Sequence, residues 1–101
     1  MLLRVFIGED DRHEGVPLYK FITELCRDRG IAGVTVFRGI MGFGKSSTLH
    51  KGSLLKLSSD LPMVIEVIDE EDKIKTLLGE LRAILEDALV TLEKVRVVVY
   101  N

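Results

Sequence analysis

Residues whose chemistry suits phosphate binding are concentrated in one short stretch of the chain, residues 38–50. The stretch follows an apolar run and contains three glycines, an arginine, a lysine, three hydroxyl side chains and a histidine. Glycines allow φ > 0 and let the backbone approach a ligand closely, and successive N–H groups can form an anion-binding concavity. The residues that could bind a phosphate or another oxyanion are Arg38, Gly39, Gly42, Gly44, Lys45, Ser46, Ser47 and His50.

Each residue type in this stretch has a role in the interpretation. Backbone N–H groups of the three glycines would hold the anion, the two cationic side chains would balance its charge, and a serine would donate a hydrogen bond. His50 is a candidate ligand or proton acceptor, although a lone loop histidine more often has neither role. A glycine-rich turn without any ligand is the alternative that composition leaves open. No catalytic residue and no metal ligand is assigned.

The same stretch matches the P-loop expression G-x-x-x-x-G-K-[ST] over residues 39–46. A functional P-loop opens a helix whose N-terminus cradles the phosphates, whereas here Gly52 would fall in the second turn. The enzymatic alternative is a small P-loop-like NTPase or phosphatase that uses Lys45, Ser46 and Asp69. It lacks an evident general base, so we expect a protein that is not an enzyme.

Composition limits the classes of protein to which the chain can belong. The 101 residues are 47% hydrophobic and 30% charged, which is typical of a single globular domain spanning residues 1–101. A net charge of −2 gives no basic field for nucleic acid. No apolar run reaches the ~18 residues of a membrane span, and the one cysteine, Cys26, cannot form an internal disulfide. We therefore expect a cytoplasmic protein without membrane insertion.

Hydrophobic periodicity predicts six elements that would position the glycine-rich stretch. The expected order is strand 2–8, helix 16–29, strand 34–37, strand 63–68, a helix beginning at 69–72, and strand 89–100. Cys26 falls on the apolar stripe of the first helix and is interpreted as a small buried hydrophobe. The order βαββαβ predicts an α+β, ferredoxin-like sandwich, with two helices on one face of an antiparallel sheet.

The two faces of this sheet differ in composition. The face expected beneath the helices carries Leu3, Val5, Ile7, Val34, Val36, Met63, Ile65, Val67, Val95, Val97 and Val99. The other face mixes large apolar and charged groups: Arg4, Phe6, Thr35, Phe37, Val64, Glu66, Ile68, Arg96, Val98 and Tyr100. A sheet that faces only water rarely carries so many large apolar groups, so this second face is predicted to contact another subunit.

Several local phrases resemble a known family of small bacterial and archaeal proteins, domain of unknown function one hundred and ninety. The phrases are Gly8-Glu9, Gly15-Val16-Pro17-Leu18-Tyr19, Gly30-Ile31-Ala32-Gly33-Val34-Thr35-Val36, Arg38-Gly39-Ile40-Met41-Gly42-Phe43-Gly44 and Leu57-Ser58-Ser59-Asp60-Leu61-Pro62. The resemblance covers nearly the whole chain. It implies a PII-like version of the ferredoxin-like fold, assembled as a homotrimer.

The resemblance to PII signalling proteins also suggests a function. The stretch after the second strand resembles their T-loop, which contacts partner proteins and, at its base, nucleotide held between subunits. The leading hypothesis is a regulatory trimer that binds a phosphate-bearing small molecule, with an adenine nucleotide as the candidate, and reports it to a membrane-transport or enzyme partner. The PII regulatory tyrosine and basic nucleotide motif are not recognisable, and a ligand-free interaction scaffold is the remaining alternative.

Overall fold

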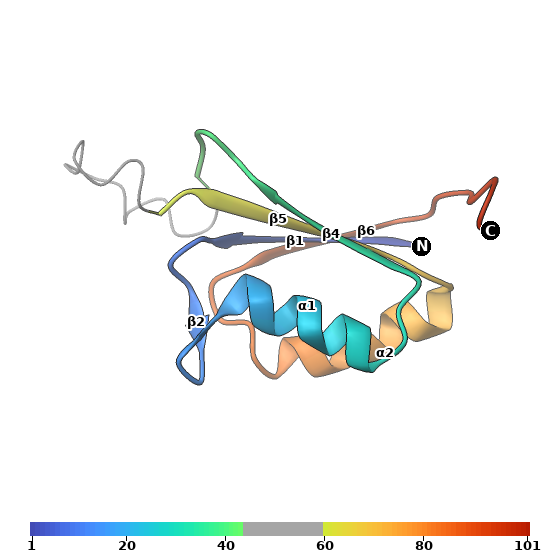
Figure 1. Ribbon diagram of the computed structural model, residues 1–101, viewed down its shortest axis with the longest axis horizontal. Coiled ribbons are helices and arrows are strands. Elements are labelled where there is room, and N and C mark those ends of the chain that lie inside the picture. Colours follow the sequence, from blue (N-terminus) through green and yellow to red (C-terminus); the bar gives the residue numbers. More distant parts are fainter. Residues whose placement is uncertain (44–59) are drawn as a thin grey trace.

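The computed structural model describes residues 1–43 and 60–101, and it has two layers, a sheet and a pair of helices that cover one face of it (Figure 1). The elements are β1 (Leu2–Gly8), β2 (Arg12–His13), β3 (Val16–Pro17), α1 (Leu18–Asp28), β4 (Gly33–Arg38), β5 (Pro62–Ile68), α2 (Glu71–Arg82) and β6 (Leu89–Glu93). No helix among the described residues is long and apolar enough to cross a membrane.

The main sheet has the strand order β4-β5-β1-β6, and every neighbouring pair is antiparallel. Each helix connects two strands that point the same way but are separated by a strand between them. This arrangement is the ferredoxin-like split βαββαβ unit, so the predicted fold class is confirmed.

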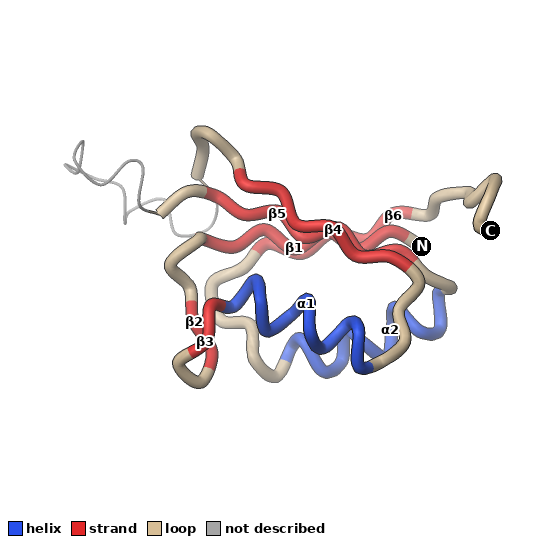
Figure 2. The backbone as a smooth tube through the Cα atoms, viewed as in Figure 1, coloured by secondary structure: helices blue, strands red, loops and turns tan. Residues whose placement is uncertain are grey.

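The entry to the first helix differs from the sequence expectation. Val16–Pro17 pairs with Arg12–His13 in a small two-stranded ribbon, which lies beside the start of α1 (Figure 2). Both turn residues, Glu14 and Gly15, have positive φ values of 52° and 78°, as a tight two-residue hairpin requires. The helix therefore begins at Leu18, two residues later than predicted, because Pro17 has an extended ψ of 129°.

The core forms where the predicted apolar faces meet. Alternate residues of β1 and β5 are buried beneath the two helices, as the period-two pattern predicted. The buried cluster is Leu3, Val5, Ile7, Leu18, Ile22, Cys26, Met63, Ile65, Val67, Ile74, Leu77 and Leu81. Burial raises the pKa of the Cys26 thiol to about 11, so the group stays protonated at neutral pH. Its interpretation as a buried hydrophobe is confirmed.

The prediction for the last strand is wrong in its length. β6 ends at Glu93, which pairs with Leu2, and β1 has no further strand residue with which the chain could pair. A ladder stops where its partner strand ends, however β-prone the sequence beyond it is. Val97 and Val99 are 54% and 69% exposed, and Val95 is also exposed, so these residues do not join the core. Arg96, Val98 and Tyr100 likewise lie outside the sheet ladder.

The residues after β6, 94–101, form a segment that we call the C-terminal tail. The tail leaves the edge of the sheet at β6 and lies on the side away from the helices (Figure 1). The Tyr100 hydroxyl donates to the carbonyl oxygen of Ala32, just before β4 on the opposite edge, at 3.3 Å. The tail thus crosses one end of the sheet with most of its apolar side chains exposed.

Gly79 offers a test of the described packing, because a methyl group added there would meet no described atom within 4 Å. Nothing in the packing therefore requires glycine inside α2. We expect Gly79→Ala to raise the free energy of unfolding by about 1 kcal/mol, since glycine is less favourable than alanine in a helix. Urea unfolding would measure this. Gly30→Ala is the contrasting variant, because Gly30 ends α1 at φ 68° and alanine should be destabilising there. A loss of stability in Gly79→Ala would contradict the described packing of α2.

Candidate functional site

The glycine-rich stretch begins at one end of the sheet, where β4 finishes beside the start of β5 (Figure 1). Arg38 pairs with Met63, and the N–H of Gly39 then donates to the carbonyl oxygen of Pro62 at 2.7 Å. This hydrogen bond extends the β4–β5 pairing by one step. It brings the chain that leaves β4 beside the chain that enters β5, and both are among the described residues.

The turn after β1 also makes hydrogen bonds to the chain that enters β5. The N–H of Glu9 donates to the carbonyl oxygen of Leu61 at 2.8 Å, and the N–H of Asp10 donates to Asp60 Oδ1 at 3.1 Å. We call the residues so connected the loop neck; they are 8–10, 38–39 and 60–62. Three chain segments distant in sequence therefore fix the position of the neck, and each of them includes the end residue of a sheet strand.

Gly39 is required in the neck for packing. A Cβ atom there would lie 2.8 Å from Pro62 Cγ, closer than Cβ atoms come to other atoms, and at a tight 3.3 Å from the Pro62 carbonyl oxygen. The Gly39 N–H already donates to the Pro62 carbonyl oxygen and is therefore engaged within the chain. Gly42, with φ 145°, adopts a backbone conformation that favours glycine, as the composition of the stretch predicted.

Arg38 lies at the neck with its guanidinium paired to the carboxylate of Glu9. This contact was not predicted from the sequence. The only available signal was the phrase Gly8-Glu9 within the family resemblance, since periodicity says nothing about which charge meets which. The remaining candidate residues, Gly44, Lys45, Ser46, Ser47 and His50, lie outside the described residues, as does the segment after the P-loop match.

Next to the neck, acidic groups surround a polar cavity of about 360 Å³ between the β1–β2 turn and the chain after α2. Burial raises the pKa of Asp11, and the carboxylates of Asp60 and Asp87 raise it further, against the lowering effect of the hydrogen bond from the Gly8 N–H. In the described part of the chain, no three His, Cys, Asp or Glu side chains come together in a way that could hold a metal ion.

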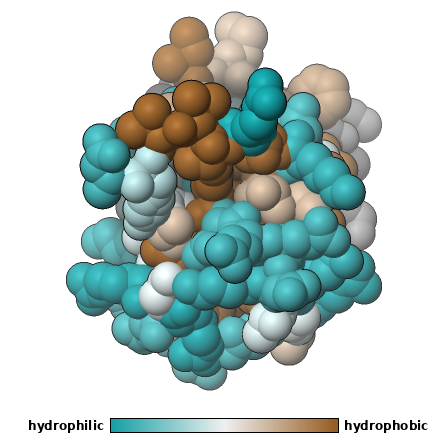
Figure 3. All heavy atoms as spheres, turned by 90° about the vertical axis from the view of Figure 1, so that its right-hand side faces the viewer, coloured by the Kyte–Doolittle hydropathy of each residue, from teal (hydrophilic) through white to brown (hydrophobic). Residues whose placement is uncertain are grey.

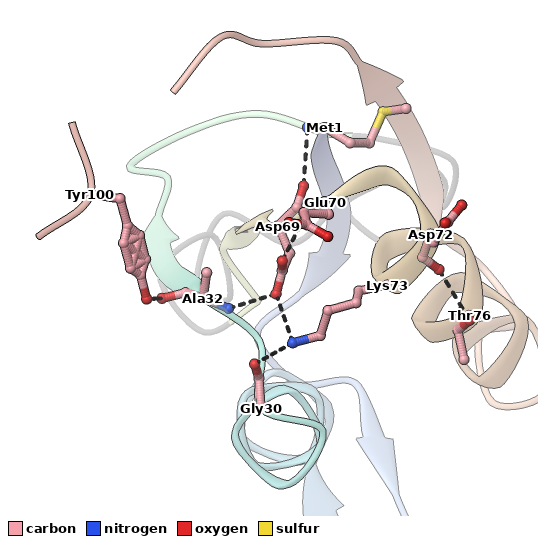
Figure 4. Close-up of polar contacts among 9 residues, drawn as sticks. All are labelled: Met1, Gly30, Ala32, Asp69, Glu70, Asp72, Lys73, Thr76 and Tyr100. Atoms are coloured by element: carbon pink, nitrogen blue, oxygen red, sulfur yellow. Dashed lines mark hydrogen bonds and ion pairs between the residues drawn. The ribbon is translucent and has the colours of Figure 1, made fainter. Parts of the chain in front are cut away.

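Asp69, the third residue of the enzymatic alternative, lies at the other end of β5 from the neck. Its carboxylate accepts hydrogen bonds from the N–H of Glu70 at 2.6 Å and of Ala32 at 2.9 Å, and it pairs with Lys73 at 3.2 Å (Figure 4). The Asp69 carbonyl oxygen also accepts from the N-terminal amine of Met1 at 3.1 Å. Its side chain is only 9% exposed. These contacts give Asp69 a role in joining strand ends to α2.

The family to which the chain is related follows from comparison with known proteins. The sequence profile of DUF190, described as "Uncharacterized ACR", matches residues 1–97. The chain belongs to this family. A UPF0166 protein of Aquifex aeolicus is 47% identical over 97 residues, which cover 96% of this chain and 91% of that protein. A UPF0166 protein of Methanocaldococcus jannaschii is 33% identical over 86 residues, covering 85% and 79%.

One solved structure shows the wider fold relationship of this DUF190 protein. CPII from Thiomonas intermedia K12, solved bound to ADP, AMP and acetate, superposes with a TM-score of 0.53 at 19% identity. The match covers 89% of this chain and 79% of the CPII chain. At this level of identity the likeness establishes the PII-like fold, and the family resemblance inferred from the sequence is confirmed.

The Asp69 contacts predict a specific dependence of stability on pH. Burial raises the pKa of Asp69, but the hydrogen bonds from Glu70, Ala32 and Lys73 outweigh it, and the pKa in the folded protein is lowered. A lowered pKa stabilises the fold above the ordinary carboxyl pKa, and this contribution is lost as the pH falls through the folded-state value. We expect Asp69→Asn to reduce the free energy of unfolding by about 1–2 kcal/mol at pH 7.

Urea unfolding at pH 7, 5 and 3 would measure the difference between wild type and Asp69→Asn, which should narrow at the lowest pH. Glu70→Gln is the control: it removes the same charge one residue away, from a carboxylate that makes no hydrogen bond or ion pair with the described residues. Equal effects of the two substitutions at every pH would contradict the role assigned to Asp69.

Proposed function

We propose that this protein is a PII-like regulator that binds a phosphate-bearing small molecule, an adenine nucleotide, at the loop neck and signals its presence to a partner protein. The observation that carries the proposal is the position of Arg38 and Gly39, where the glycine-rich stretch begins, at an end of the sheet that the turn after β1 holds in place. A cationic fork beside closely approaching backbone suits a phosphate. CPII, which shares the fold, was solved with ADP and AMP, which supports a nucleotide as the ligand class.

A regulatory role is favoured over an enzymatic one by the position of Asp69. The carboxylate that the NTPase alternative needs is engaged with backbone N–H groups and Lys73 at the opposite end of β5. A carboxylate held in this way has little capacity left to hold magnesium or to accept a proton. In the proposed mechanism, binding energy therefore stabilises one state of the neck instead of a reaction's transition state. A membrane-transport or enzyme partner would recognise that state.

The ligand proposal is tested by measuring thermal stability with AMP, ADP and ATP, with and without magnesium. Binding to the folded state raises stability by RT ln(1 + [L]/Kd), about 2.7 kcal/mol at a hundredfold excess over Kd. Lys45→Ala should weaken the binding roughly tenfold or more, because one charge-assisted contact is lost. Lys20→Ala, on the exposed surface of α1, is the control. Indifference to every nucleotide would favour the scaffold alternative, and turnover abolished by Lys45→Ala would favour the enzyme.

The proposed assembly is a homotrimer formed through the side of the sheet away from the helices, which we call the outer face. Across this face, register places Phe37, Val64, Phe6 and Leu89 in one row that crosses all four strands. Phe37 and Leu89 are each half exposed. A continuous apolar row of this kind is costly to leave in water. We refer to it as the aromatic row.

The charged groups of the outer face are already paired within the protomer. Arg4 contacts Glu66 at 2.8 Å and Glu93 at 3.2 Å. Burying these three side chains against a second subunit would therefore not leave an unpartnered charge. Further along the same side, apolar residues gather where the C-terminal tail lies (Figure 3). The aromatic row and the apolar tail together give the outer face two surfaces that a neighbouring copy could cover. A closed ring of copies would leave neither exposed.

Sedimentation equilibrium at micromolar concentration tests this assembly, with a mass of three chains as the expected result. Phe37→Arg should lower the average mass, because it puts a charge into the aromatic row without touching the buried core. Val16→Arg is the matched control, since Val16 is an exposed apolar residue in the small ribbon beside α1. A monomeric wild type would refute the trimer, and an equal loss of mass in both variants would refute the outer face as the interface.

A further inference from the structure

We propose that Glu9 is an internal competitor for the ligand's phosphate, which occupies Arg38 in the free protein and so sets how strongly the loop neck binds anions. The inference rests on the proposed function and adds a residue that neither the glycine-rich motif nor the family resemblance assigns. The observation behind it is the ion pair between the Arg38 guanidinium and the Glu9 carboxylate.

Glu9 is held in place by the backbone on both sides of it. Its own N–H donates to the carbonyl oxygen of Leu61 at 2.8 Å, and the next N–H, that of Asp10, donates to Asp60 Oδ1 at 3.1 Å. The Glu9 side chain is only 20% exposed. Because this side chain has little freedom, its carboxylate presents a negative charge at a fixed place beside Arg38. Forming the ion pair then costs little further side-chain entropy.

Arg38 is fixed at its backbone and open at its head group. The residue ends β4 opposite Met63, and the N–H of the following Gly39 donates to Pro62. The side chain is 57% exposed, and its terminal nitrogen Nη2 contacts a Glu9 carboxylate oxygen. A guanidinium has five N–H donors, so an incoming anion can reach Arg38 while Glu9 is still in contact with it.

Carboxylate and phosphate present similar oxygen geometry to a guanidinium, and both are bound by the same fork of donors. A phosphate at Arg38 must therefore either share the fork with Glu9 or displace its carboxylate. In both cases the ligand meets a fixed negative charge a few ångströms away. Glu9 thus lowers the affinity for phosphate by two routes, by engaging the cation and by repelling the anion.

A carboxylate outside the loop neck separates the proposed role of Glu9 from a change in net charge. Glu24 lies on the exposed surface of α1, and its carboxylate makes no ion pair or hydrogen bond with the described residues. Glu9→Gln and Glu24→Gln change the net charge equally, but only Glu9→Gln removes a charge that contacts Arg38. An effect restricted to Glu9→Gln would therefore report the charge held at the neck.

The experiment measures Kd for ADP and for inorganic pyrophosphate by titration calorimetry at fixed ionic strength, using the full chain. We expect Glu9→Gln to bind both ligands roughly three- to tenfold more tightly than wild type, and Glu24→Gln to change Kd less than about twofold. In an Arg38→Ala background, Glu9→Gln should give a smaller gain. Damage to the fold would weaken binding, so tighter binding cannot arise from a structural defect.

The outcomes separate this inference from the proposed function. If wild type binds and Glu9→Gln binds no more tightly than Glu24→Gln, Glu9 has only a structural role in the neck and this inference alone is overturned. If Glu9→Gln weakens binding, Glu9 contacts the ligand favourably and the competitor role is also overturned. If neither wild type nor Glu9→Gln binds ADP or pyrophosphate, the ligand proposal and this inference fail together.

Discussion

The seven-residue antiparallel pairing of β1 with β5 is the constraint on which the rest of the structure depends. It joins residues more than fifty positions apart and puts Leu3, Val5 and Ile7 beside Val67, Ile65 and Met63 beneath the helices. Because side chains alternate along a strand, this single register also decides what reaches the outer face. It sets Arg4 opposite Glu66 and Phe6 opposite Val64. A slip of one residue would bury the ion pair and expose the core.

The same pairing determines what each end of the sheet can do. At one end, β1 finishes beside the start of β5, so Glu9 meets Leu61 and the neck closes. At the other end, the Met1 amine donates to the Asp69 carbonyl oxygen, and the Asp69 carboxylate accepts from Ala32, Glu70 and Lys73. Polar groups occur at both ends, but their environments differ. Asp69 is nearly buried and fully engaged, whereas Arg38 keeps an exposed head group, and only the second arrangement leaves donors for a ligand.

Local pattern was sufficient to predict much of this fold. Alternation in residues 2–8 and 63–68 identified the two central strands, and the stripe through Ile22 and Cys26 identified α1, because burial on one face imposes a period on the sequence. The tail was mispredicted for the complementary reason. Residues 95–99 are the most β-branched of the chain, but a strand needs a partner, and the length of β1 is not visible in the sequence of the tail.

Sequence patterns selected the stretch of chain that holds the candidate site, but they did not predict the contacts made there. Glycine density and the nearby cations marked residues 38–50, whereas the packing of Gly39 on Pro62 and the pairing of Arg38 with Glu9 depend on contacts across the sheet. Such contacts follow from register, which single-sequence patterns specify only through the hydrophobic faces. Sequence therefore favoured a role for the Gly39 N–H in holding an anion, while the structure gives that N–H to Pro62.

The aromatic row and the loop neck share a strand, and this connects the two proposals physically. Phe37 is the residue immediately before Arg38 on β4, and their side chains point to opposite faces because successive residues of a strand alternate. A neighbouring copy that packs on Phe37 would restrict the end of β4, and with it the backbone that presents Arg38. If assembly has already ordered the end of β4, ligand binding costs less conformational entropy of the protein. Association and anion binding would then favour each other, and by linkage the coupling would be the same in both directions.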